Sequence, residues 1–213
     1  MTKPCPARAD TTRGSALIIA LVATVLLGAL GIGLVMIGNT EGAIAANSRT
    51  GGEALYAADA AAEHAVQDLL VQPRWDDILS GTVQSWFVDH TLTPTIASNE
   101  RISLTAMTAD LQRRSDTGAP WGLNNPQWRL FAYGPLSQIT GTGTIESPAY
   151  LVVWLADDPS ETDGNPSVDA NGVVTIVARA LGLFGSVRTI EVTMAKTTAS
   201  PVSAHVLSWR EIR

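Results

Sequence analysis

An uncharged apolar run over residues 16–38 constrains this chain more than any other feature. The run has 23 residues, and Thr24 is its only polar side chain. At a rise of about 1.5 Å per residue, a helix of that length reaches roughly 34 Å and exceeds the bilayer core of about 30 Å. The sequence therefore predicts a transmembrane helix at about 16–38.

The residues before this run are mainly basic. Positions 1–13 carry Lys3, Arg8 and Arg13 against one acid, Asp10. Positive charge beside a membrane segment tends to remain cytoplasmic. We therefore expect the bulk of the chain, which follows the run, to lie outside the cytoplasm.

Two interpretations fit the start of the apolar run. The run is too long for the core of an ordinary secretory signal, and no convincing A-x-A cleavage site follows it closely. Arg13-Gly14-Ser15 resembles the site cut by prepilin peptidases, which would cleave between Gly14 and Ser15 and leave the hydrophobic helix on the mature protein. An uncleaved signal anchor fits these three residues equally well. The first interpretation makes residues 1–14 a leader peptide.

Glycine recurs in and just after the apolar run. Gly38 and Gly42 have the GxxxG spacing that lets membrane helices approach closely. Ordinary glycine use in transmembrane helices explains any single one of these glycines. Together they suit a helix that packs among like helices.

Helical periodicity continues beyond the apolar run. The apolar residues that recur on one helical face are Leu55, Ala58, Ala62, Ala65, Val66 and Leu69. This face is narrow and mostly alanine, so a sheet that covers it can approach closely. Pro73 restricts Gln72 to extended backbone, and we therefore predict one long helix over 15–72. His64 is expected on its exposed side.

The remaining residues, 73–213, predict a globular head with an antiparallel sheet of about four or five strands. Six segments are candidates for these four or five strands, namely 84–89, 101–107, 127–133 (with Trp128, Leu130 and Ala132 on one side), 150–156, 173–181 and 187–194. Residues 150–156 are nearly all apolar and suit a central strand buried on both faces. Residues 182–186 suit a hairpin loop, and the tail at 197–213 is either a last edge strand or an ordered tail.

Packing this sheet on the alanine face gives an α+β fold, a long N-terminal helix against a C-terminal antiparallel sheet. Cys5 is the only cysteine and precedes the apolar run. A mature chain that begins at Ser15 therefore cannot contain a disulfide, and its head must be stabilised by packing alone.

An acidic loop over 157–172 is the one candidate metal site. Its carboxylates are Asp157, Asp158, Glu161, Asp163 and Asp169. Calcium takes six to eight hard oxygen ligands, but no glutamate closes this loop at the twelfth position of an EF-hand. The alternative is a solvated connection between two strands, which is the usual role of such loops.

No motif in the chain indicates catalysis. The three histidines lie far apart, and the sequence has no H-E-x-x-H, G-x-S-x-G, P-loop or dinucleotide fingerprint. A net charge of −6 without a Lys or Arg block argues against a nucleic-acid partner. We therefore expect neither an enzyme nor a cofactor. Trp121, Trp209 and the loops at 108–126 and 134–148 are the candidates for contact with partner subunits.

The N-terminal region resembles a known family. Arg13-Gly14, the apolar run, Asn47-Ser48-Arg49 and the alanine-rich segment that ends in Ala61-Ala62-Glu63 follow the order found in the PilX family of minor pilins. The resemblance covers roughly residues 12–70. It implies a pilin-like fold, cleavage by prepilin peptidase and N-methylation of Ser15.

One position departs from the pattern of major pilins. They usually carry glutamate at the fifth mature position, which is Ile19 here. A carboxylate in a filament core is costly unless it pairs, for example with the N-terminal amine of a neighbouring subunit. A subunit without it loses that contact, which makes it a poor repeating unit and a tolerable one at a filament end.

The resemblance therefore implies a minor type IV pilin that primes or caps the filament at or near its tip. Its expected partners are other minor pilins, the major pilin, prepilin peptidase and a tip adhesin. It would reside in the inner membrane before assembly and at the cell surface afterwards. The alternatives are a minor pseudopilin of type II secretion and a membrane-anchored extracytoplasmic binding domain without a filament role.

Overall fold

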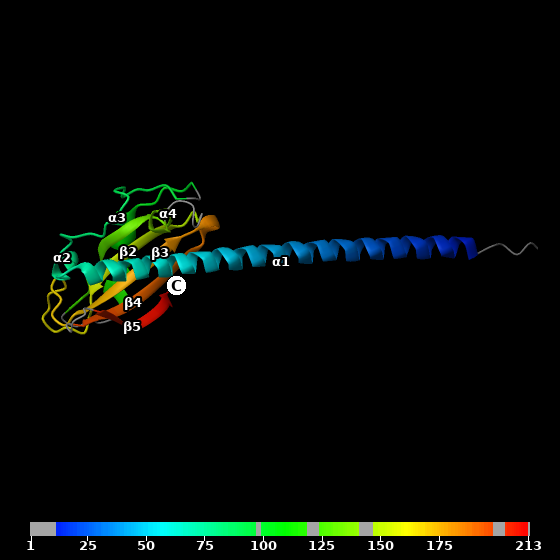
Figure 1. Ribbon diagram of the computed structural model, residues 1–213. Helices are drawn as coiled ribbons and strands as arrows, with labels where there is room; N and C mark the ends of the chain where they lie inside the picture. Colours follow the sequence, from blue (N-terminus) through cyan, green and yellow to red (C-terminus); the bar gives the residue numbers. More distant parts are fainter. Residues whose placement is uncertain (1–11, 97–98, 119–123, 141–146, 198–202, 213) are drawn as a thin grey trace, which may run out of the picture. The chain divides into compact units, whose positions relative to one another are not determined.

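The computed structural model describes residues 12–96, 99–118, 124–140, 147–197 and 203–212. The chain divides into two units, Met1–Asn47 and Ser48–Arg213. The longest element, helix α1 (Thr12–Val71, 60 residues), contributes to both units (Figure 1). Most of the expected leader, including Cys5, lies outside the described residues.

The first unit contains the apolar part of α1. Its most apolar 18-residue window has a mean hydropathy of 2.7, and none of it is buried by the protein. Apart from the helix's own nearby backbone, no described atom lies within 4 Å of a Cβ built on Gly28, Gly31, Gly33, Gly38 or Gly42. By length and composition this helix is able to cross a membrane, as predicted.

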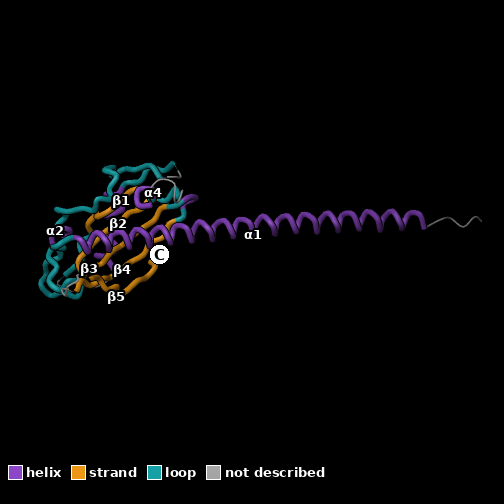
Figure 2. The backbone as a smooth tube through the Cα atoms, viewed as in Figure 1, coloured by secondary structure: helices purple, strands orange, loops and turns teal. Residues whose placement is uncertain are grey.

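The second unit is built on one antiparallel sheet. Its strands are β1 (Arg129–Pro135), β2 (Tyr150–Asp157), β3 (Val173–Leu181), β4 (Val187–Thr197) and β5 (Ser203–Ile212). They lie in sequence order, so each strand pairs with the next one along the chain (Figure 2). Shorter elements are α2 (Asp76–Leu79), α3 (Leu104–Gly118), α4 (Ser137–Thr140) and the 3-10 turn η1 (Leu183–Gly185). The α+β layout is confirmed, and the tail forms an edge strand, β5.

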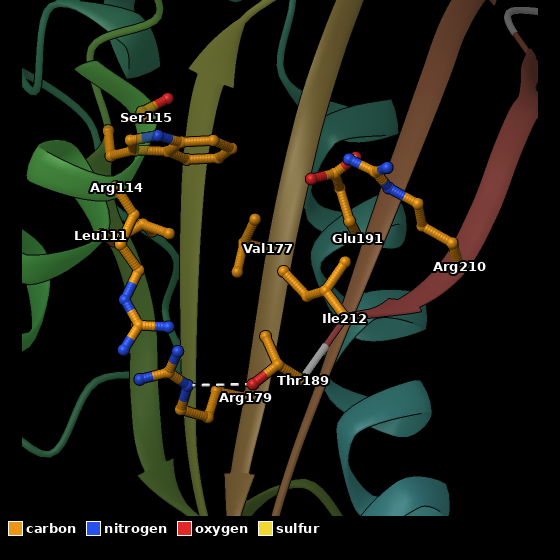
Figure 3. Close-up of a pocket in the computed structure, with 10 residues that line it drawn as sticks. Leu111, Arg114, Ser115, Val177, Arg179, Thr189, Glu191, Arg210 and Ile212 are labelled. Atoms are coloured by element: carbon orange, nitrogen blue, oxygen red, sulfur yellow. Dashed lines mark hydrogen bonds and ion pairs between the residues drawn. The ribbon is translucent and has the colours of Figure 1, made fainter. Parts of the chain in front are cut away.

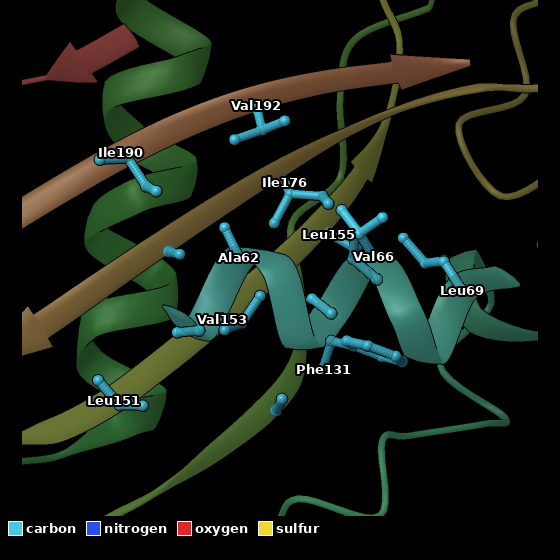
Figure 4. Close-up of a cluster of buried hydrophobic side chains, with 14 of the residues drawn as sticks. Ala62, Val66, Leu69, Phe131, Leu151, Val153, Leu155, Ile176, Ile190 and Val192 are labelled. Atoms are coloured by element: carbon cyan, nitrogen blue, oxygen red, sulfur yellow. The ribbon is translucent and has the colours of Figure 1, made fainter. Parts of the chain in front are cut away.

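The alanine face of α1 covers one side of the sheet. Ala58 and Ala65 are fully buried, and Leu69 is 1% exposed. They pack with Leu151, Val153 and Leu155 of β2 and with the inward side chains of β3 and β4 (Figure 4). Because alanine is small, the helix backbone can lie close to the strands.

Helix α1 ends where the sequence predicts. Its last residue is Val71, two positions before Pro73. The Trp75 indole donates a hydrogen bond to Leu69 O at 3.0 Å, and Lys196 Nζ donates to Gln72 O at 3.3 Å. A cation at a helix C-terminus also complements the helix dipole.

Helix α3 covers the opposite side of the sheet. Leu104 and Leu111 pack with Tyr150, Val152 and Trp154, the alternate residues of β2. Every residue of β2 is therefore buried, which confirms a central strand covered on both faces. The second unit thus has three layers, helix, sheet and helix.

The strand expected at 101–107 is wrong, because α3 begins there. Ser103 Oγ accepts a hydrogen bond from the backbone N–H of Ala106 at 3.2 Å, which is the contact of a helix N-cap. Leu104, Met107 and Leu111 then follow helical spacing and contact the sheet. The alternating segment at 101–107 is too short to distinguish the period of a strand from that of a helix. The expected partner loop at 108–126 is helical up to Gly118 for the same reason.

Two further strand predictions need correction. Residues 84–89 form no strand, and only an isolated bridge pairs Val88 with Tyr133. In β1 the register shifts between Leu130 and Ala132, so these side chains point to opposite faces instead of sharing one. A β-bulge of this kind breaks simple alternation.

The alanine face generates the first prediction. Ala58→Leu should destabilise the fold by about 1–3 kcal/mol, because the added carbons have no space between helix and sheet. Gln67→Leu introduces the same side chain on the exposed side of α1 and should change the melting temperature little. Thermal unfolding of the full chain in detergent, followed by circular dichroism, measures both. Equal melting temperatures for the two variants would contradict the packing described.

Candidate functional site

The acidic loop between β2 and β3 contains a buried carboxylate cluster. Asp157, Asp158 and Glu161 are 0%, 4% and 8% exposed, and one carboxylate oxygen from each lies within 4.8 Å of the others. Asp157 is the last residue of β2, so the burial of that strand carries its carboxylate inside. Of the five acids predicted, the structure brings these three together.

The other two acids have different surroundings. Asp163 is exposed and accepts a hydrogen bond from the backbone N–H of Asn165. Asp169 is half-buried, and its Oδ1 accepts from the N–H groups of Gly172 and Val173 at 2.7 and 3.2 Å. These contacts shape the loop before β3 and leave both acids outside the cluster.

The environment of the cluster disfavours negative charge. Burial raises the pKa of Asp157 to about 7, the hydrogen bond from Asn124 opposes this shift, and the charge of Glu161 adds to it. Burial is also the main cause that raises the pKa of Glu161 and of Asp169. In the part of the chain that the structure describes, no ion pair involves these carboxylates.

Asn124 joins the cluster from the segment that precedes β1. It is fully buried, and its Nδ2 donates to Asp157 Oδ2 at 2.8 Å and to Asp158 O at 3.0 Å. The Asn124 Oδ1 atom and the Glu161 Oε2 atom are buried and have no hydrogen-bond partner. No sequence pattern indicates Asn124, because it lies 33 positions before Asp157 in a segment predicted to be a loop.

A second candidate is a pocket on the α3 side of the sheet. It has a volume of about 220 Å³ and lies between Leu111 of α3 and residues of β3, β4 and β5 (Figure 3). Two of its arginines have carboxylate partners, as Arg114 pairs with Asp110 and Arg210 with Glu191. The volume is below the range of about 300–1,000 Å³ typical of small-molecule sites.

Most of the polar side chains that line this pocket are hydrogen-bond donors. Arg179 donates from Nε to Thr189 Oγ1 at 3.0 Å, and its guanidinium lies 5.7 Å from the Trp154 ring centroid. Burial, followed by the charge of Arg114, lowers the pKa of Arg179. The Trp128 Nε1 atom is buried without a partner. The pocket can therefore receive a small group that accepts hydrogen bonds, and sequence patterns did not indicate it.

His64 is not on the exposed side of α1, contrary to expectation. Its side chain is 12% exposed, and its ring centroid lies 4.9 Å from that of Trp86 and 5.6 Å from that of Phe87. The segment after α2 covers this side of the helix. The buried face of α1 is therefore wider than the alanine stripe alone.

A buried polar contact fixes that segment to α1. Ser85 Oγ donates a hydrogen bond to Asp68 Oδ2, and His64 Nδ1 lies 3.7 Å from the same oxygen. The carboxylate stands between serine and histidine, whereas an activated serine nucleophile contacts the histidine itself. We interpret this trio as a structural contact.

The residues expected to act in processing and assembly lie on α1. Gly14 and Ser15 are both within the helix, and Ile19 is 68% exposed. Among the tryptophans expected to contact partners, Trp121 lies outside the described residues. Trp209 on β5 is 48% exposed and donates to Asp59 Oδ1 at 3.1 Å. In the loop at 134–148, residues 137–140 form α4, and 141–146 lie outside the described residues.

Comparisons of the chain with protein-family models, with curated proteins and with solved structures found no match. Any function must therefore be argued from the residues and contacts above.

The buried contact between Ser85 and Asp68 generates the second prediction. Ser85→Ala should destabilise the fold by about 1–3 kcal/mol, because it leaves a buried carboxylate oxygen without its donor. Ser80→Ala removes an exposed hydroxyl and should have little effect. Thermal unfolding of the full chain in detergent compares them. A Ser85→Ala variant as stable as Ser80→Ala would show that the contact contributes nothing to stability.

Proposed function

We propose that this protein is a minor pilin of a type IV pilus, a structural subunit that helps to prime or cap the filament at or near its tip. The observation that carries the proposal is helix α1. Its first part is apolar and unburied, while its second part carries the sheet on an alanine face. This is the plan of a subunit that is anchored in the membrane and then assembled through the same helix.

The unburied apolar helix supports an assembly role. Large side chains such as Leu17, Leu26 and Leu34 are 57–73% exposed, so the chain itself supplies no cover for them. Lipid or neighbouring helices must provide it. The open space around Gly38 and Gly42 is what close approach of a second helix requires.

The order of sequence elements points to the PilX family. Arg13-Gly14-Ser15, the apolar run and Asn47-Ser48-Arg49 precede an alanine-rich segment, as in that family. Under this proposal prepilin peptidase cuts after Gly14, and Ser15 becomes the methylated N-terminus. The head then lies outside the inner membrane, and its partners are the major pilin, other minor pilins and a tip adhesin.

Ile19 supports a position at a filament end. A repeating subunit gains register from a glutamate that pairs with the N-terminal amine of its neighbour. Ile19 provides no such contact and carries no desolvation cost for a charge. A subunit with one neighbour can dispense with a contact that a repeating subunit needs.

Processing generates the third prediction. A Gly14→Val variant should accumulate as a slower-migrating, uncleaved band on an immunoblot from the native organism, because the branched side chain occupies the peptidase site. Gly31→Ala changes a glycine in the helix away from the site and should be processed normally. Mass spectrometry of the mature wild-type chain should find a methylated Ser15 at its N-terminus. A wild-type chain that keeps residues 1–14 would overturn the proposal and favour a membrane-anchored binding domain.

Deletion of the gene separates the two filament systems. The proposal expects surface pili to decrease while secretion of folded proteins continues. Loss of secretion with normal pili would instead identify a type II pseudopilin.

The fourth prediction concerns Ile19. Ile19→Glu should increase the amount of this subunit in sheared filaments, because the carboxylate can pair with a neighbouring amine. Ile19→Gln is the matched control, since it has the same shape without the charge. Immunoblots of sheared fibres against whole cells measure the ratio. A higher ratio for Ile19→Gln than for Ile19→Glu would contradict the electrostatic argument.

A further inference from the structure

We propose that the loop between β2 and β3 is a calcium site, with ligands from the carboxylates of Asp157, Asp158 and Glu161 and from the amide oxygen of Asn124. This inference goes beyond the filament role and does not depend on it. It reduces the candidate ligands from the five acidic residues of the loop to three, and it adds Asn124 from another segment as a fourth ligand.

The first argument is uncompensated charge. The three carboxylates are at most 8% exposed, and their oxygens lie within 4.8 Å of one another. Buried charges in proteins are normally paired with an opposite charge or bound to a metal ion. In the described part of the chain, no Lys, Arg or His pairs with any of the three. A divalent cation supplies the missing positive charge.

The second argument is independent of charge and concerns two unpartnered oxygens. Glu161 is held through Oε1, which accepts from the backbone N–H groups of Ala170 and Asn171 at 2.9 and 2.7 Å. Its Oε2 is buried and has no donor, although Glu161 belongs to the cluster. The Asn124 Oδ1 atom is in the same situation. A cation bound among the three carboxylates gives Glu161 Oε2 a partner, and it gives one to Asn124 Oδ1 once the Asn124 amide turns toward it.

Asn124 is placed to become a ligand by a small movement. Its Nδ2 now contacts Asp157 Oδ2 and Asp158 O, two acceptors of the site. A half-turn of the amide exchanges Nδ2 for Oδ1 without moving the backbone. In that orientation the Asn124 amide oxygen faces the oxygens of Asp157 and Asp158. This arrangement is repulsive without a cation and favourable when a cation lies between the oxygens.

The donor set selects calcium. All candidate ligands are hard oxygens, without the sulfur or nitrogen that zinc and copper prefer. The three carboxylate oxygens lie within 4.8 Å of one another, which is close enough for all of them to contact one calcium ion at a bond length of about 2.4 Å. Three carboxylates, one amide and water molecules complete the six to eight oxygens that calcium takes.

A bound ion would join three parts of the head. Asp157 ends β2, Glu161 lies in the following loop and Asn124 precedes β1. The loop is also tied to α2, because the backbone N–H of Asp169 donates to Asp76 Oδ1 at 2.9 Å. Calcium therefore stabilises the end of the sheet where these segments meet.

Calcium titration of the full chain in nonionic detergent tests the proposal. After treatment with a chelator and dialysis, calcium should release or absorb heat with one site per chain and a dissociation constant of about 1 mM or lower, as in extracellular modules. It should also raise the melting temperature, and magnesium at equal concentration should raise it less. No heat and no shift at about 10 mM calcium, or an equal response to magnesium, would overturn the proposal.

Two matched variants locate the site. Glu161→Gln should weaken calcium binding at least tenfold, because it removes a charged ligand but keeps the shape of the side chain. Asp163→Asn removes the same charge from the same loop at an exposed position and should change the affinity less than threefold. Equal losses in the two variants would indicate diffuse attraction and would overturn the assigned ligands. Native mass spectrometry of the wild-type chain gives a reading independent of the variants, and a stoichiometry other than one calcium would contradict a single site.

Discussion

The close packing of alanines on the sheet is the interaction on which the second unit depends. Ala58 and Ala65 are fully buried, and so are the β2 side chains that alternate toward them and toward α3. An antiparallel sheet commonly exposes one face to water, but here helices cover both faces of β2, while the edge strand β5 stays largely exposed. This double cover supplies a core on each side of β2 to a unit whose residues, 48–213, include no cysteine.

The same packing explains the acidic cluster. Because β2 is buried from its first to its last residue, its terminal Asp157 has no route to water and its pKa is raised to about 7. Asp158 and Glu161 follow one and four residues later. Their carboxylates are held in place by hydrogen bonds: Asp158 accepts from the Ser160 N–H and from Asn171 Nδ2, and Glu161 accepts from the Ala170 N–H. A loop that composition alone would place in solvent is therefore partly an extension of the core.

Sequence patterns predicted the elements whose periodicity is long or whose burial is uniform. The end of α1, the burial of β2 on both faces and the hairpin of β3 and β4 are of this kind. Predictions for short segments were wrong, because the seven residues at 101–107 fit both the strand period and the helix period. There the N-cap hydrogen bond of Ser103 favours the helix. The hydrogen-bond partners of Asp157 could not be predicted for another reason. Contacts such as the one with Asn124 depend on tertiary structure and leave no pattern in the local sequence.

Helix α1 changes its surroundings along its length, and the change follows from its side chains. Residues 16–38 are apolar on every side of the helix, so packing against one surface cannot cover all of their side chains. Residues 54–69, in contrast, are apolar on one face only. Polar residues return at Asn39 and Glu41, before the boundary of the two units at Asn47. A helix apolar on every side is satisfied equally by lipid tails and by similar helices, because lipid is as apolar as leucine. Under the proposed pilin role, transfer of this helix from bilayer to filament would therefore cost little hydrophobic free energy, and shape complementarity at the glycines would decide where it packs.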